Sequence, residues 1–181
     1  MARLGPPLTV APFATSETQS TTEYTGKFGV VFIDPDNPLN RYMLVDCQEA
    51  FVVGEIVVIN GSGQASQATS TSVGQLGMIV ATVSGSDTAA YAQITGLWSS
   101  AIVSSGVTTA AGLIVPATSD GGYFDVDTSG GNLVWGARAV TAASTATSPF
   151  AGISGLGALA DVLVSQGGAY VKGISENLIT S

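Results

Sequence analysis

The sequence predicts an all-β protein, a small barrel or sandwich of short strands. Hydrophobic residues make up 45% of the 181 residues and charged residues only 10%, which is the composition of a folded chain rather than a disordered one. The residues between the apolar runs are mostly Gly, Ser and Thr, which suit exposed strands and turns. Helices at a protein surface would instead carry Glu, Lys and Arg at these positions.

The first 26 residues are expected to form an extended N-terminal arm. Pro6, Pro7 and Pro12 exclude a helix, and residues 15–25 are rich in hydroxyl side chains. Apolar side chains are nevertheless scattered along the arm. Two explanations stay open: a frayed tail, or an arm that becomes ordered along another subunit. In the second case the contact residues are Leu8, Val10, Phe13 and Tyr24.

Residues 27–150 are expected to form a β-rich core domain. The strand candidates in its first part are Lys27–Ile33, Tyr42–Cys47, Phe51–Ile59 and Tyr91–Trp98. The sequence Asp34–Pro38 closes the first of them and has the chemistry of a turn. Asn60 and Gly61 follow a β-branched run, and this pair is a strong hairpin signal because both residues tolerate positive φ.

An internal repeat organises the core domain. Gly54–Val57 and Gly77–Val80 are separated by a turn-rich spacer, and Gly112–Val115 and Gly136–Val140 are separated by a spacer of almost the same length. Chance similarity in a chain rich in Gly and Val is the alternative. The repeat predicts two related hairpin units.

The C-terminal segment 151–181 is expected to pack on the core or on a neighbouring subunit. Residues 154–166 have the length of a short helix, although Gly155 and Gly157 weaken that prediction. Ala169–Ile174 is a candidate for a final strand.

The charge pattern excludes two classes of partner. The chain has five basic and 13 acidic residues, a net charge of −8, and no basic residue between Arg41 and Arg138. Nucleic-acid binding needs several Lys or Arg side chains at the phosphates, so we expect no nucleic-acid partner. Anionic membranes are excluded as partners for the same reason.

No targeting or membrane segment is expected. A basic region followed by an apolar one is missing at the N-terminus, which predicts no secretory signal. The longest apolar stretch, Ile153–Val164, is too short to span a bilayer and contains Asp161. We therefore expect a protein made in a cytoplasm.

The sequence offers little for catalysis, and we expect no enzyme, no catalytic residue and no cofactor. Without histidine, neither a Ser-His-Asp nor a Cys-His nucleophile can be assembled. The single cysteine, Cys47, lies in an apolar run and is interpreted as a core residue rather than a reactive thiol. The close carboxylate pairs Asp34/Asp36 and Asp125/Asp127 lie among turn formers, where Asp caps the local backbone.

One segment has the spacing of metal ligands. Asp125, Asp127 and Ser129 alternate before Gly130, as in the opening of a calcium loop. The closing acidic ligand would fall at position 136, which is glycine. We therefore favour a polar hairpin turn and expect no metal, while a cation on Asp125 and Asp127 stays open.

Trp98 and Trp135 are the two largest apolar side chains. Tryptophan anchors both cores and interfaces. A core position is favoured for each, and Trp98 is also kept as an interface candidate.

The glycine-led strands resemble those of the small phage capsid decoration (cement) proteins of the DUF2190-type family. In that family glycine begins each G-x-x-V strand, and a G-[VLI]-[FW] step lies between the two halves. The matching residues, within about 47–142, are Gly54–Val57, Gly77–Val80, Gly96–Trp98, Gly112–Val115 and Gly136–Val140. The resemblance implies a compact β-barrel-like domain, commonly trimeric, at three-fold positions of an icosahedral shell, with no catalytic residues.

The expected function is therefore that of a structural virion protein on the outer surface of a phage capsid. Its partners would be the major capsid protein and two further copies of this chain, in a homotrimer. Two alternatives are kept. One is another virion component, such as a tail or fibre protein. The other is a carbohydrate-binding or adhesin module, for which Tyr123–Asp125 offers aromatic side chains beside an acid.

Overall fold

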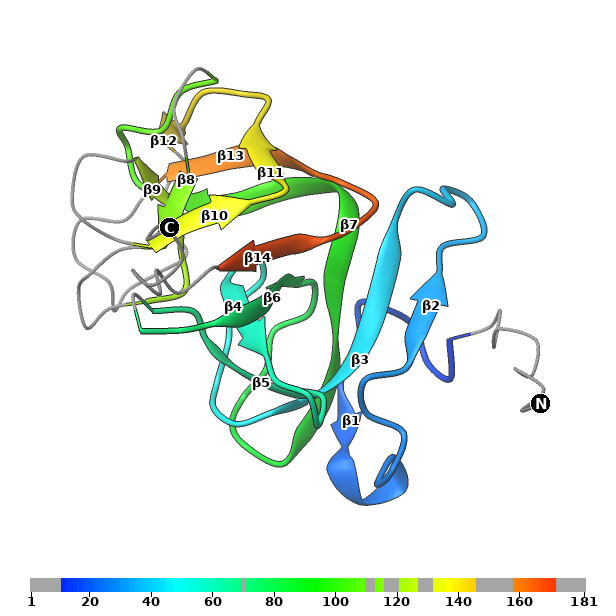
Figure 1. The fold of residues 1–181 in the computed structure, drawn as a ribbon. Coiled ribbons are helices and arrows are strands. Elements are labelled where there is room, and N and C mark those ends of the chain that lie inside the picture. The colour runs from blue at the N-terminus through cyan, green and yellow to red at the C-terminus, as the bar shows by residue number, and fades with distance from the viewer. Residues whose placement is uncertain are drawn as a thin grey trace, which may run out of the picture.

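The fold is all-β, as the sequence predicts (Figure 1). The computed structural model describes residues 11–69, 71–109, 113–115, 121–126, 132–145 and 158–171. Within these ranges the one helical element is a short 3-10 turn, η1 (Thr21–Glu23). The strands are β1 (Gln19–Ser20), β2 (Val31–Ile33), β3 (Arg41–Cys47), β4 (Ile56–Ile59), β5 (Gln64–Gln67), β6 (Gly74–Ile79), β7 (Thr88–Val103), β8 (Leu113–Val115), β9 (Asp125–Val126), β10 (Asn132–Trp135), β11 (Ala137–Ala139), β12 (Ser144–Thr145), β13 (Ala158–Val164) and β14 (Ala169–Val171).

Five strands close into a small barrel. Hydrogen-bonded pairing runs in the order β3, β5, β4, β6, β7 and returns to β3. The β3–β5 pair is parallel and the other four are antiparallel. Buried side chains from these strands fill the barrel, among them Val45, Cys47, Val57, Ile79 and Ala92. Closure removes free edges from this part of the sheet.

The hairpin predicted at Asn60-Gly61 connects β4 to β5. The Asn60 side-chain oxygen accepts hydrogen bonds from the amides of Ser62 and Gln64, at 2.9 and 3.0 Å. An asparagine that bonds the backbone beyond it in this way stabilises a tight turn locally. The positive φ expected at Asn60 and Gly61 is instead found at Gly63, with φ +77°.

β7 joins this barrel to the rest of the structure. Its first half pairs with β3 and its second half with β13. Gly96 stands between the halves with φ +87°, and a Cβ there would lie 2.9 Å from the Leu39 carbonyl oxygen. Only glycine allows the 39–40 turn to cross the strand so closely. The Gly96–Trp98 step therefore lies at a bend between two halves of the fold.

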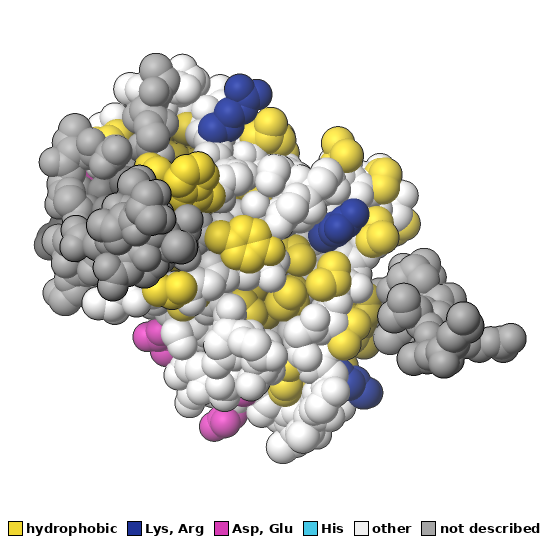
Figure 2. Space-filling view, in the orientation of Figure 1, with side chains coloured by type: hydrophobic (Ala, Val, Ile, Leu, Met, Phe, Trp, Pro, Cys, Tyr) yellow, Lys and Arg dark blue, Asp and Glu magenta, His cyan; other side chains and the backbone are white. Residues whose placement is uncertain are grey.

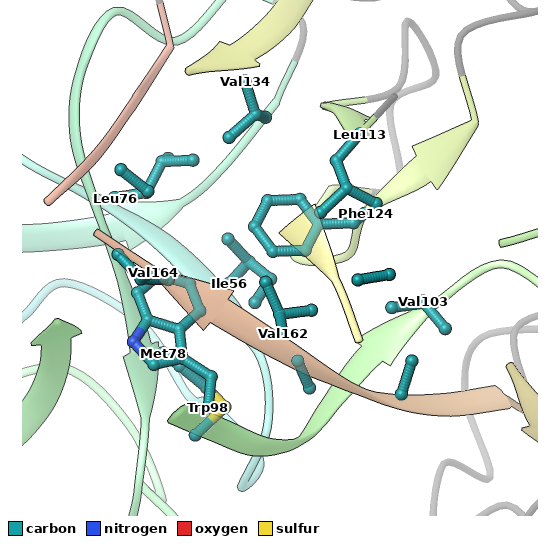
Figure 3. Close-up of a cluster of buried hydrophobic side chains, with 14 of the residues drawn as sticks. Ile56, Leu76, Met78, Trp98, Val103, Leu113, Phe124, Val134, Val162 and Val164 are labelled. Carbon is teal, nitrogen blue, oxygen red and sulfur yellow. The ribbon is translucent and has the colours of Figure 1, made fainter. Parts of the chain in front are cut away.

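A second hydrophobic cluster lies beside the barrel (Figure 3). It is enclosed by the second half of β7 and by β13, β6, β14, β10 and β8. Phe124, which directly precedes β9, forms an isolated parallel β-bridge with Val103 at the end of β7. The largest side chains of the cluster are Trp98, Phe124, Ile56, Leu76 and Leu113.

The two predicted hairpin units share one strand order. In the first unit β4 lies between β5 and β6, and in the second β8 lies between β9 and β10. The glycines do not all correspond, however. Val57 pairs with Gly77, whereas Val115 pairs with Asn132 and not with Gly136. Gly136 instead forms a bend with φ +81° between β10 and β11.

Residues 11–26 lie against the core of their own chain. Phe13 contacts Tyr24 and Tyr91, with ring centroids 5.2 and 4.7 Å apart, and Phe32 meets Tyr91 edge to face. β1 pairs with the start of β7. This part of the extended arm thereby covers the outer face of β7.

The suggestion of a short C-terminal helix is wrong over the residues that the structure describes there. Ala158–Val164 forms β13, which pairs with β7 on one side and with β11 and β12 on the other. Ala158, Ala160, Val162 and Val164 are all buried. This alternation has the period of a strand, and small and β-branched side chains suit the narrow space against β7.

Candidate interaction surface

The carboxylate pairs serve the backbone where the structure describes them. The Asp34 side chain accepts a hydrogen bond from the Asp36 amide at 2.9 Å, which is the turn that the sequence predicts. Asp125 bonds the Ser104 hydroxyl and the Val126 amide. Asp127, Ser129 and Gly130, the other residues of the calcium-loop spacing, lie outside the described residues. In the described ranges no three acidic or cysteine side chains gather as metal ligands would.

The aromatic pair suggested for carbohydrate binding is buried. Phe124 is fully enclosed and Tyr123 is 7% exposed. Because a sugar platform needs an exposed ring face, these two residues cannot provide one in this fold.

Trp98 is also enclosed. Its side chain is completely buried and its ring stacks on Phe124. Trp98 is therefore a core residue in this structure and presents no surface to a partner. Leu8 and Val10 lie outside the described residues, whereas Phe13 packs on Tyr91 of the same chain and Tyr24 packs on Phe13.

Trp135 is exposed, whereas the sequence favours a core position for it. It lies at the end of β10 and is 57% exposed. Its cross-strand partner is Tyr170 of β14, which is 43% exposed. Directly opposed residues of neighbouring strands point to the same side of a sheet, so the two rings lie side by side on the surface.

A second exposed pair continues this surface. Leu97 of β7 is opposite Leu163 of β13, and Leu163 is in turn opposite Arg138 of β11. All three side chains are exposed. Arg138 and Leu163 also line a hollow of about 250 Å³ together with Gly136, Ala137 and Ser165.

The two pairs are linked through Gly136 and the turn 165–168. The Ser165 amide donates to the Gly136 carbonyl at 2.8 Å, and the Ser165 hydroxyl donates to the Gly168 carbonyl at 3.2 Å. A Cβ on Gly136 would run into the Gly168 carbonyl oxygen. The bend at Gly136 therefore brings the two rows close together.

We call this surface the apolar face, formed by Leu39, Leu97, Trp135, Arg138, Leu163 and Tyr170. Leu39 is 59% exposed, and it lies beside the turn 165–168 because its carbonyl oxygen accepts bonds from Thr95 at 2.7 Å and Gln166 at 3.1 Å. Figure 2 shows hydrophobic atoms gathered over β14, β10 and β11.

The apolar face is held by the core behind it. On β10, β13 and β14 the exposed residues alternate with Val134, Val162, Val164 and Val171, which are buried in the cluster of Figure 3. Side chains on regular strands over a packed core lose little freedom when a partner binds. Large exposed apolar groups on such a surface mark interaction sites, and Trp, Tyr and Arg are the residues most enriched in binding hot spots.

Two buried titratable groups lie away from this surface. Burial, with a smaller effect of Asp46, raises the pKa of Cys47 to about 12. Burial also raises the pKa of Glu55, although its carboxylate accepts hydrogen bonds from the Val52 amide at 3.0 Å and from Gln67 at 2.8 Å. Both groups belong to the packing of the barrel.

Comparison with known proteins returned no match to a protein family, to a curated protein or to a solved structure. No helix within the described ranges has the length and apolar character needed to cross a membrane.

Proposed function

We propose that this chain is a structural virion protein that binds the outside of an assembled icosahedral phage capsid and stabilises it as a cement protein. The observation that carries the proposal is the apolar face, where Trp135, Tyr170 and Arg138 are exposed on a rigid sheet. The resemblance of the glycine-led strands to capsid decoration proteins supports the choice of a capsid as the partner.

A cement protein acts through binding alone. By binding only where several capsid subunits meet, it stabilises the assembled shell by mass action. In a homotrimer three copies of the apolar face act together, so that moderate individual contacts combine into tight attachment. The major capsid protein is the partner in this proposal, and the virion surface is the location.

In this proposal the apolar face, and not the N-terminal arm, makes the main contact with the capsid. Phe13 packs on Tyr91 of the same chain and Tyr24 packs on Phe13, so both side chains are partly buried within their own chain. Removing residues 1–25 would expose Tyr91 and weaken the fold as well as any contact. A point substitution on the apolar face separates binding from folding more cleanly.

The experiment uses purified undecorated shells of the phage that encodes this chain. We expect Trp135→Ala to weaken cosedimentation with the shells about ten-fold or more, as hot-spot tryptophans do, with unchanged thermal stability. Val53→Ala is the matched control, because Val53 is 50% exposed but lies in the turn before β4. Undiminished binding of Trp135→Ala would contradict the role of the face.

The same face also favours carbohydrate binding as the second candidate, because an amide lies beside its aromatic rings. Trp135 and Tyr170 are exposed side by side. The Tyr170 ring and the Gln75 side-chain amide both lie close to Gly168, within about 3.5 Å of the position that a Cβ would take on this glycine. Aromatic rings beside an amide are a common arrangement for sugars. Binding of the isolated protein to a glycan array, lost in Trp135→Ala, would support this candidate. If the chain is instead a tail or fibre protein, it will be found in the tail or fibres of the particle and not on the capsid.

A further inference from the structure

The outer edge of β2 is a second surface with binding capacity. β2 pairs with β3 on one side, with Val31 opposite Met43 and Ile33 opposite Arg41. Beyond β2 the structure places no further strand among the described residues, and Figure 1 shows it at the margin of the fold. β2 is therefore an edge strand.

The hydrogen-bonding groups of β2 alternate between its two sides. The Val30 carbonyl accepts from the Leu44 amide at 3.0 Å, and the Asp34 amide donates to the Asn40 carbonyl at 3.1 Å. In an antiparallel pair every second residue bonds the neighbouring strand. The amides and carbonyls of Val31 and Ile33 consequently point away from β3, and no described residue bonds them.

The side chains at this edge are apolar and partly exposed. Val31 is 37% and Ile33 is 38% exposed, while Phe32 between them is buried against Tyr91. Proteins usually protect such an edge with charges, proline or a covering segment. β2 itself carries none of these protections in the sequence Val31-Phe-Ile33.

A groove lies at the Ile33 end of β2. It has a volume of about 630 Å³ and is lined by residues 11 and 13–15 and by Phe32, Ile33 and Tyr42. Asp34 and Asp36 line it as well, and no lysine or arginine does. The groove thus combines an open strand edge, apolar walls and negative charge at the end where β2 meets its turn.

We infer that the β2 edge binds an extended segment of a partner protein as an added strand. The open amides and carbonyls of Val31 and Ile33 fit an extended backbone. The apolar walls fit a segment with β-branched residues at alternate positions. The two aspartates select a segment with lysine or arginine at the end that reaches the turn. This inference does not depend on the proposed capsid role.

The test uses three synthetic peptides and the isolated full-length protein. The first is acetyl-Lys-Val-Thr-Val-Thr-Val-amide. The second has glutamate in place of lysine, and the third has proline in place of the central valine. Binding is followed by the amide NMR signals of Val31 and Ile33 and by their hydrogen exchange.

We expect the lysine peptide to bind saturably and to protect the amides of Val31 and Ile33 from exchange. The glutamate peptide should bind at least several-fold more weakly, and the proline peptide should not protect these amides. In the Asp36→Asn variant, the difference in affinity between the lysine peptide and the glutamate peptide should become smaller. Asp36 suits this test because it is exposed and only its backbone amide holds the turn.

Three results would overturn the inference. The first is no binding of the lysine peptide at millimolar concentration, and the second is equal binding of the lysine and proline peptides. The third is signal changes confined to the apolar face, which would place the peptide at Trp135 and Tyr170 instead. The peptide experiment contains no capsid. Its results can therefore be interpreted even if the proposed capsid role is wrong.

Discussion

Trp98 and Phe124 form an offset stack, with ring centroids 6.2 Å apart and planes 9° apart. Trp98 comes from β7, the strand shared by the barrel and the second cluster, and Phe124 comes from the chain next to β9. Figure 3 shows the two rings among the side chains that fill this cluster. The stack therefore ties the second hairpin unit to the strand that also builds the barrel.

We expect Trp98→Ala to lower the free energy of unfolding by about 3–5 kcal/mol, the cost typical of emptying a large aromatic site in a core. Trp98→Phe should cost clearly less, because it keeps a ring in the site. The buried indole N–H also has no hydrogen-bond partner among the described residues. Urea denaturation of the two variants measures both values. A loss below about 1 kcal/mol for Trp98→Ala would contradict this packing of Trp98.

The two tryptophans should differ in fluorescence because one is buried and the other is exposed. In Trp135→Phe the remaining emission comes from Trp98 and should be blue-shifted and resistant to acrylamide quenching. In Trp98→Phe the remaining emission comes from Trp135 and should be red-shifted and readily quenched. Similar quenching of the two variants would mean that Trp135 is covered in solution, for example by another copy of the chain.

Cys47 should be unreactive in the folded protein. Its side chain is fully buried, and burial raises the pKa of its thiol to about 12. Because the thiolate is the reactive form, almost none is present at pH 8. A disulfide reagent should therefore label no thiol in the native protein and one per chain in guanidinium. Rapid labelling of the native protein would show that the barrel opens.

Glu55 should make stability depend on pH with a defined sign. Burial raises its pKa in the folded chain above the ordinary value of 4.5, so the folded state holds the proton more strongly than the unfolded state. The resulting contribution of Glu55 to the free energy of unfolding is fully present below pH 4.5 and is lost as the pH rises through the raised pKa. The stability of the wild type relative to Glu55→Gln should thus fall over this range, as measured by urea denaturation at several pH values. A difference that rises with pH would show instead that the carboxylate is stabilised in its charged form.

Local sequence signals predicted the class of fold and several of its turns. The Asn60-Gly61 hairpin and the Asp34 turn form because each side chain bonds the backbone just beyond it. The strand order of the two hairpin units also follows the repeat. Closure of the barrel through the parallel β3–β5 pair depends on residues distant in sequence, and no local pattern marks it.

The positions of the surface residues were harder to predict. Along β10 Val134 is buried and Trp135 exposed, and along β14 Tyr170 is exposed between Ala169 and Val171, which are buried. The period of two was present in both short strands. The size of the tryptophan side chain nevertheless favours a core position, because burying a large apolar side chain stabilises the folded state. The sequence favours a helix over β13 because its alanine and leucine residues are strong helix formers, and pairing with β7 overrides that propensity.

We propose that this chain coats a capsid from the outside. The most direct test is a cryo-electron microscopy reconstruction of the particle whose genome encodes the chain. We expect density for the five-stranded barrel at three-fold positions of the outer shell surface, with Trp135 and Tyr170 facing a capsid subunit. Density for the chain in the tail alone, or an outer shell surface without it, would contradict this proposal.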